Sequence, residues 1–175
     1  ENDWGSLGYK EADYDDSKSV TYAVEFLKQE RDGPFFLACG LFRPHLPWYV
    51  PQPYFDRYPL DEVVLPKVRK DDLKDVPNAG KAFAKARKKD LETILEADQY
   101  REAVQAYLAS ITYADAQLGR VLEALEESSQ ADNTVVVLWS DHGWHLGEKG
   151  HWHKTTLWEE ATRVPFIISA PGYEP

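Results

Sequence analysis

The chain has 175 residues, a formal charge of −10 and a pI of about 4.9, and 43% of its residues are hydrophobic. This apolar content excludes an intrinsically disordered chain, and the acidity argues against a nucleic-acid-binding protein with a globally basic surface. The single cysteine excludes an internal disulfide framework. The longest apolar run, residues 35–42, is too short to cross a bilayer. Because the chain contains no methionine and begins with Glu1, we expect a processed product or a piece of a longer protein, with any signal peptide upstream.

The first periodic element is a helix predicted to start at Asp15 or Asp16. Either aspartate is a plausible N-cap, and Asp32-Gly33-Pro34 is expected to end the helix. The continuous apolar run 35–41 that follows predicts a strand buried on both faces. Cys39 lies in this run and is therefore expected to be a core residue.

Two unusual segments come next. Residues 43–66 hold six prolines among several aromatic residues, which predicts an ordered, irregular loop packed on the domain. Residues 67–89 hold nine basic and three acidic residues. A solvated loop and helix face is the simpler interpretation of this basic stretch, and a patch for an anionic substrate or partner is the alternative.

The clearest helix is predicted over residues 98–128, with an apolar stripe along one face. Asp115 lies on that stripe and is expected to be a buried carboxylate that fixes the helix to a neighbouring backbone. The runs 134–139 and 164–170 are β-branched or apolar without alternation, and they predict further strands of a buried, mostly parallel sheet. Helices between such strands indicate the α/β class.

The candidate site follows the strand 134–139. Four of the five histidines lie in residues 142–153, beside Asp141 and Lys154. In open α/β sheets, ligands bind at the carboxyl ends of strands, and Asp141 and His142 could both reach a cation from a loop at that position. A carboxylate favours calcium or magnesium, whereas several imidazoles favour zinc. The other three histidines are therefore alternative ligands beside His142, although two tryptophans in the loop favour packing. These residues are His145, His151 and His153.

Three separated stretches, in the same order along the chain, resemble the sulfatase family. The stretch 140–154 reads Ser-Asp-His-Gly-Trp-His-Leu-Gly-Glu-Lys-Gly-His-Trp-His-Lys and resembles the C-terminal active-site segment of sulfatases, most closely of the iduronate-2-sulfatase-like group. The stretch 34–47 resembles that group's strand followed by a basic residue and Pro-His-x-Pro, and the stretch 107–125 resembles its long helix. The resemblance implies a partial alkaline-phosphatase-like sandwich, with a buried, mostly parallel sheet flanked by helices.

The resemblance also implies roles for individual residues. Asp141 matches an aspartate that binds the divalent cation, usually calcium, with magnesium as the alternative. His142 matches a histidine that binds this cation or contacts the sulfate group. Lys154 matches a lysine that holds the sulfate ester oxygens, and His45 matches a histidine near the substrate. The metal, the lysine and a proton donor are the groups that sulfate ester hydrolysis needs.

The chain departs from the family pattern at the nucleophile. Sulfatases use a formylglycine made from Cys or Ser in a Cys/Ser-x-Pro-x-Arg context, and Cys39 lacks that proline. The nucleophile and further metal ligands are therefore expected in an N-terminal portion outside residues 1–175, and this chain alone is expected to be inactive. Residues 67–97 are interpreted as a basic, insertion-like segment of the catalytic domain.

The expected activity is hydrolysis of a sulfate monoester on a small molecule or glycan. A phosphodiesterase or phosphonate hydrolase on the same scaffold, and a non-catalytic glycan-binding module, are the alternatives. The expected partners are that substrate and the N-terminal portion, with homo-oligomerisation through exposed strand edges as a further option, and neither nucleic acid nor a membrane span is expected. The family implies a periplasmic, secreted or lysosomal location.

Overall fold

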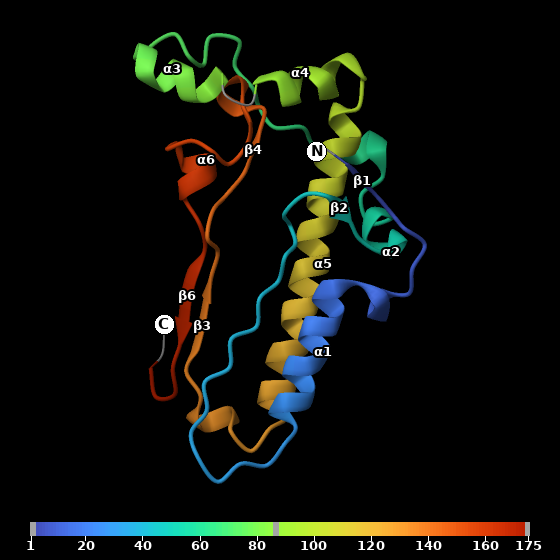
Figure 1. The fold of residues 1–175 in the computed structure, drawn as a ribbon, viewed down its shortest axis with the longest axis vertical. Helices are drawn as coiled ribbons and strands as arrows, with labels where there is room; N and C mark the ends of the chain where they lie inside the picture. The colour runs from blue at the N-terminus through green and yellow to red at the C-terminus, as the bar shows by residue number, and fades with distance from the viewer. Residues whose placement is uncertain (1–2, 86–87, 174–175) are drawn as a thin grey trace. The chain divides into compact units, whose positions relative to one another are not determined.

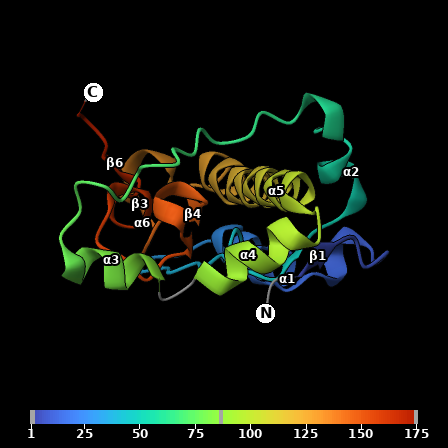
Figure 2. The same ribbon diagram turned by 90° about the horizontal axis from the view of Figure 1, so that it is seen from above.

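The computed structural model describes residues 3–85 and 88–173, so Arg87 of the basic stretch lies outside the described residues. The chain forms two compact units. The first comprises Glu1–Val63 and Gln105–Thr134, and the second comprises Val64–Val104 and Val135–Pro175. The long helix α5 (Tyr100–Glu126) begins in the second unit and continues into the first (Figures 1 and 2).

The first unit is built on two helices, α1 (Asp15–Leu27) and α5. Short elements complete it: β1 (Trp4–Gly5), η1 (Glu11–Asp13), β2 (Trp48–Tyr49), α2 (Gln52–Phe55), η2 (Leu60–Glu62) and η3 (Ala131–Asn133). Strands β1 and β2 pair in parallel. Arg120 joins the two helices, because its guanidinium donates to Ser17 Oγ and Thr21 Oγ1 of α1 over 3.0 Å in each case.

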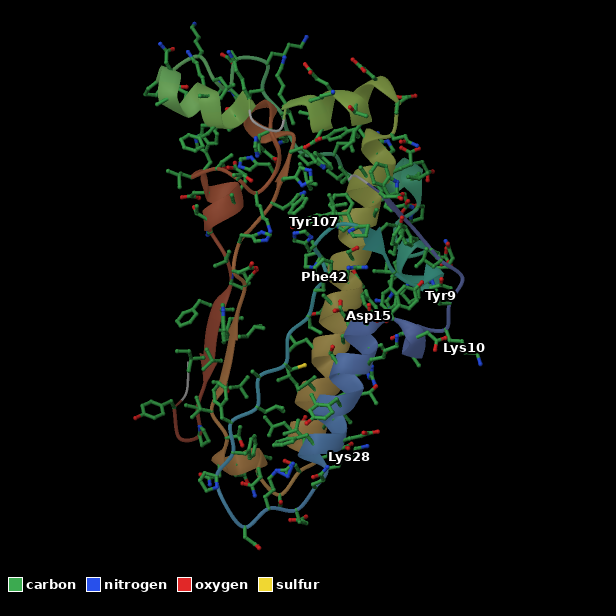
Figure 3. All side chains as sticks on the ribbon, viewed as in Figure 1. Tyr9, Lys10, Asp15, Lys28, Phe42 and Tyr107 are labelled. Carbon is green, nitrogen blue, oxygen red and sulfur yellow. The ribbon has the colours of Figure 1, made fainter. Side chains whose placement is uncertain are left out.

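The N-terminus of α1 differs from the prediction. Figure 3 shows Asp15 at the start of α1 and Lys28 beyond its other end. Tyr14 is the N-cap residue and makes no side-chain capping bond, so neither aspartate caps the helix. Asp16 instead turns inward and is buried, on the same helical face as Val20, Ala23 and Leu27.

The proline-rich segment 43–66 is ordered, as predicted, and most of its aromatic residues are buried. Trp48 is fully buried, and Tyr54 and Phe55 are 8% and 7% exposed. Tyr54 packs against Tyr113 of α5 with ring centroids 5.2 Å apart. The segment is less irregular than expected, since it contains β2, α2 and η2.

Helix α5 confirms the predicted long helix but buries a different face. Asp115 is exposed, so the predicted buried carboxylate is wrong. The buried face has the helical spacing Ala106, Ser110, Tyr113, Gln117 and Ala124. Apolar residues also occur on other faces of α5, and Ile111 and Leu122 are 40% and 41% exposed. Periodicity could not choose between these faces, and small side chains allowed the closer packing.

The predicted strand over residues 35–41 is not formed among the described residues. This segment is extended without a strand partner, Phe36 is 91% exposed and Cys39 is exposed. Cys39 is therefore not a core residue of the structure. An apolar run shows that a segment suits burial in a sheet, but a strand also needs a neighbour to pair with.

The second unit contains the remaining elements. Helices α3 (Asn78–Lys85), α4 (Lys88–Glu96) and α6 (Glu159–Thr162) are accompanied by β3 (Val136–Trp139), β4 (His145–Leu146), η4 (Glu148–Gly150), β5 (Trp152–His153) and β6 (Phe166–Ser169). Strands β3 and β6 confirm two predicted strands, and the mixture of helices and strands confirms the α/β class.

The pairing of these strands corrects the prediction of a buried, parallel arrangement. Strand β3 runs antiparallel to β6, from Val136 opposite Ser169 to Trp139 opposite Phe166. Trp139 and Phe166 are 62% and 68% exposed. A continuous apolar run indicates that both faces suit burial, but it carries no information on the direction of the neighbouring strand. Among the described residues, no helix is long and apolar enough to cross a membrane.

Candidate active site

The predicted site loop, residues 140–154, is a shaped hairpin in the second unit. Strands β4 and β5 pair antiparallel, with His145 opposite His153 and Leu146 opposite Trp152. Gly147 and Gly150 have φ of 120° and 62° in the turn between them, conformations that favour glycine. The phenol of Tyr100 donates to the Leu146 carbonyl over 2.6 Å. Burial raises the pKa of Tyr100 to about 12, so this donor keeps its proton at neutral pH.

Gly143 lets the start of the loop lie directly against α6. Its amide donates to the Ala161 carbonyl over 2.7 Å. A Cβ at this position would lie 2.2 Å from the Glu160 carbonyl oxygen, which is far inside van der Waals contact. Glycine is therefore required for the approach that fixes Asp141 and His142 beside α6.

The structure brings together Asp141, His142 and Lys154 in the second unit. Lys154 Nζ lies 2.7 Å from His142 Nε2, and Asp141 Oδ2 lies 3.6 Å from the same nitrogen. His142 Nδ1 lies 2.8 Å from the Gly143 carbonyl oxygen, which only accepts, so Nδ1 carries the proton and Nε2 accepts from Lys154. An ammonium, an imidazole and a carboxylate thus converge on one point.

The fit of this cluster to a cation is partial. The Asp141 side chain is 84% exposed, so its oxygens are accessible to a metal ion. His142 Nε2 accepts from Lys154 Nζ, so this nitrogen is directed at the ammonium group in the structure. In residues 3–85 and 88–173, no group of three or more His, Cys, Asp or Glu side chains is placed to hold a metal ion. Among the candidate ligands, the exposed Asp141 carboxylate is the group whose oxygens are open to solvent.

The other three histidines of the loop have packing roles, so the arrangement does not support a zinc cluster around His142. His145 and His151 are fully buried, with ring centroids 5.0 Å apart. His145 Nε2 lies 2.7 Å from Thr156 Oγ1, and burial followed by the neighbouring His151 lowers the pKa of His145. His153 packs on Trp144, as the two tryptophans in the loop suggested.

His45 lies in the first unit, in the turn that begins the proline-rich segment. Its backbone amide donates to the Phe42 carbonyl over 3.0 Å, and its Nδ1 donates to the Leu46 carbonyl over 2.7 Å. Because the Leu46 carbonyl only accepts, His45 Nδ1 carries a proton in this contact. The partners named here for His45 belong to the first unit.

Asp16 of α1 contacts the His45 turn, a role that the sequence, which indicated a helix N-cap, did not predict. Its Oδ1 and Oδ2 accept hydrogen bonds from the backbone amides of Phe42 and Arg43, over 2.7 and 3.0 Å respectively. The buried carboxylate thus holds the backbone two residues before His45. The signal was present, since Asp16 precedes Val20 by four residues and so extends the buried face of α1.

Comparisons with known proteins agree on one family. The Sulfatase family model matches residues 2–175. A sulfatase of Formosa agariphila is 42% identical over 171 residues, which is 97% of this chain and 34% of that protein. The iduronate 2-sulfatase of Homo sapiens is 34% identical over 180 residues, covering 95% of this chain and 32% of that protein.

Solved structures support the fold. The phosphonate monoester hydrolase of Silicibacter pomeroyi superposes with a TM-score of 0.80 at 27% identity, covering 95% of this chain and 35% of that chain. This confirms the alkaline-phosphatase-like α/β fold predicted from the motifs. The chain spans about a third of the length of the curated relatives it matches. Since the family model matches almost every residue, the chain belongs to the sulfatase family.

Proposed function

We propose that this chain is the C-terminal portion of a sulfatase catalytic domain and that the complete protein hydrolyses a sulfate monoester. The observation that carries the proposal is the convergence of Lys154 and Asp141 on His142 in a loop whose sequence follows the sulfatase pattern. A sulfate ester carries its negative charge on terminal oxygens, and a lysine beside an imidazole can bind those oxygens.

Each residue has a distinct part in the proposal. Lys154 holds the sulfate oxygens, and His142 orients Lys154 through its Nε2 lone pair. Asp141 binds a divalent cation, calcium by preference for oxygen ligands and magnesium as the alternative. Such a cation, when bound, neutralises charge that develops on the sulfate group. His45 is assigned to the substrate side, where its protonated form would contact the sulfate or give a proton to the leaving alcohol.

The nucleophile is proposed to be a formylglycine supplied from outside these 175 residues. Cys39 is followed by Gly-Leu-Phe-Arg, which lacks the proline of the modification context. The apolar side chains of β3 and β6 are exposed. Apolar sheet surfaces and strand edges are normally covered, which supports the proposal that the remainder of the protein supplies more of the sheet. The basic segment 67–97 would then be an insertion-like part of this larger domain.

The substrate class proposed is a sulfated small molecule or sugar, and the proposed location is the periplasm, the extracellular space or the lysosome. A phosphonate or phosphate diester hydrolase is the second candidate, favoured by the structural similarity to a phosphonate monoester hydrolase. Both reactions need an anionic tetrahedral group bound by a metal and a lysine, so the site alone does not separate the two.

The test uses the complete polypeptide that contains this chain, assayed with an aryl sulfate and with an aryl phosphonate monoester. We expect the aryl sulfate to be the better substrate, and Lys154→Ala to lower kcat/KM for it by about 10²-fold, because one transition-state contact is lost. Lys18→Ala is the matched control, since Lys18 is 60% exposed and pairs with Asp15 on the surface of α1. Preference for the phosphonate would favour the second candidate, and equal activity of Lys154→Ala and the control would contradict the assigned site.

A further inference from the structure

Two residues of the site loop have a backbone conformation that is unfavourable for their side chains. Lys149 and His153 have φ of 58° and 79°, in the left-handed region that normally favours glycine. Among the described residues, Asp98 is the one other residue with a side chain that has positive φ. Such conformations persist where the surrounding structure holds them, and they concentrate at functional sites.

Asp72 holds the first of these residues. Its Oδ2 accepts the backbone amide of Lys149 over 3.0 Å, and its Oδ1 accepts Lys149 Nζ over 2.8 Å. The Asp72 and Lys149 side chains are 18% and 22% exposed, so the pair is largely shielded from water. The hydrogen bond from Lys149 Nζ lowers the pKa of Asp72, which keeps the carboxylate ionised. One side chain therefore fixes both the backbone and the ammonium of Lys149.

Asp90 of α4 holds the second residue. Its Oδ2 lies 3.3 Å from His153 Nε2, and the two side chains are 30% and 15% exposed. His153 also packs on Trp144, with ring centroids 4.9 Å apart. The imidazole thus contacts both a carboxylate and an indole. His153 directly precedes Lys154, whose Nζ contacts His142.

Both carboxylates come from the segment 67–97, which the sequence indicated to be a basic, insertion-like segment. We propose that Asp72 and Asp90 are positioning residues, which hold Lys149 and His153 in their left-handed conformations and thereby direct Lys154 toward His142. The segment 67–97 is then a clamp on the site loop. A third contact agrees with this role, because His151 Nδ1 donates to the Ala84 carbonyl of α3 over 3.0 Å.

The inference rests on the proposed function for its catalytic consequence. A displacement of the order of 1 Å at a catalytic group is enough to lower a rate considerably. The position of Lys154 itself can be measured without catalysis, through the reactivity of its amine toward an acylating reagent. Hydrogen bonding to His142 and partial burial both slow that reaction in the intact loop.

The experiment compares Asp72→Ala and Asp90→Ala with Asp71→Ala in the complete protein. Asp71 is the matched control because it lies on the same segment, is exposed, and pairs with Arg69 of that segment. We expect Asp72→Ala and Asp90→Ala to lower kcat for an aryl sulfate about tenfold with little change in KM. We expect labelling of Lys154, followed by peptide mass spectrometry, to rise about fivefold as its hydrogen bond is lost.

A second variant separates positioning from simple stabilisation. Glycine adopts positive φ without strain, so Lys149→Gly added to Asp72→Ala should restore kcat to within about twofold of the wild type. Asp90→Asn keeps an oxygen beside His153 and should lose less activity than Asp90→Ala.

Two results would overturn the inference. One is a double variant no more active than Asp72→Ala, and the other is unchanged Lys154 labelling in both alanine variants. A wild-type protein with no activity on either ester would refute the proposed function instead, while the Lys154 labelling would still report on the clamp.

Discussion

Gly143→Ala is expected to disturb the candidate site more than its size suggests. The added Cβ would lie 2.2 Å from the Glu160 carbonyl oxygen, whereas ordinary contacts begin near 3.4 Å. The obstacle is backbone, so no side-chain rotation can relieve the clash. The loop must instead retreat from α6 by about 1 Å, since packed interiors have no space to absorb the methyl group.

The size of the effect follows from that displacement. The retreat breaks the hydrogen bond from the Gly143 amide to Ala161, and overpacking of this kind costs about 1–3 kcal/mol of unfolding free energy. Asp141 and His142 immediately precede Gly143 and move with it. A shift of about 1 Å at such groups can lower kcat by up to about 10²-fold.

The assay is kcat/KM for an aryl sulfate, measured on the complete protein beside its urea denaturation curve. Gly33→Ala is the matched control, because a Cβ added there would have no neighbouring atom within 4 Å and the φ of Gly33 is not in the left-handed region. The control should keep wild-type activity. Wild-type activity of Gly143→Ala would refute the reasoning, since it would show that the loop does not depend on this close approach.

Three further predictions concern stability and titration. Asp16→Ala leaves two part-buried backbone amides without their carboxylate acceptor and should lower the unfolding free energy by about 1–3 kcal/mol in urea. Asp15→Ala, at a 97% exposed side chain, should have little effect. The pKa of His145 is lower in the folded chain than its ordinary value of 6.5, so the unfolded chain binds more protons below pH 6.5. The unfolding free energy should therefore fall on acidification below pH 6.5, with a slope of up to about 1.4 kcal/mol per pH unit. His145→Gln should reduce this slope. Tyr100→Phe should lower the unfolding free energy by about 1 kcal/mol, because one hydrogen bond is lost. The absorbance near 295 nm that the wild type has and the variant lacks should titrate at about pH 12.

Each of these has a clear contrary outcome. Equal destabilisation by the Asp16 and Asp15 variants would contradict the buried acceptor role. A slope that is unchanged in His145→Gln would assign the acid sensitivity to other groups. If the difference in absorbance between the wild type and Tyr100→Phe titrates near pH 10, the Tyr100 hydroxyl is not buried against the Leu146 carbonyl.

The grouping of Asp141, His142 and Lys154 could be predicted because these residues are close together in sequence. Asp141 and His142 are adjacent, and the hairpin of β4 and β5 needs only a few residues to return the chain to Lys154. Local spacing and turn-forming glycines therefore carry most of the information. The roles of His145 and His151 were less predictable, since burial depends on what packs against the loop.

The incorrect predictions from the sequence have a common physical cause. The burial of Asp115 and of Cys39, and the direction in which β3 pairs with β6, are each set by the distant segment that lies alongside. Helical or strand periodicity identifies faces that suit burial, but it does not choose among several such faces or set the direction of a neighbour.

The sequence by itself determined the family, the α/β class, the long helix and the cluster of Asp141, His142 and Lys154, because each is encoded in a motif or a period of nearby residues. The tertiary structure alone showed that Asp16 holds the His45 turn and that Asp72 and Asp90 hold the site loop. These contacts join residues that are far apart in the chain. Such pairings are set by packing of the folded chain, so no local pattern of residues could have specified them.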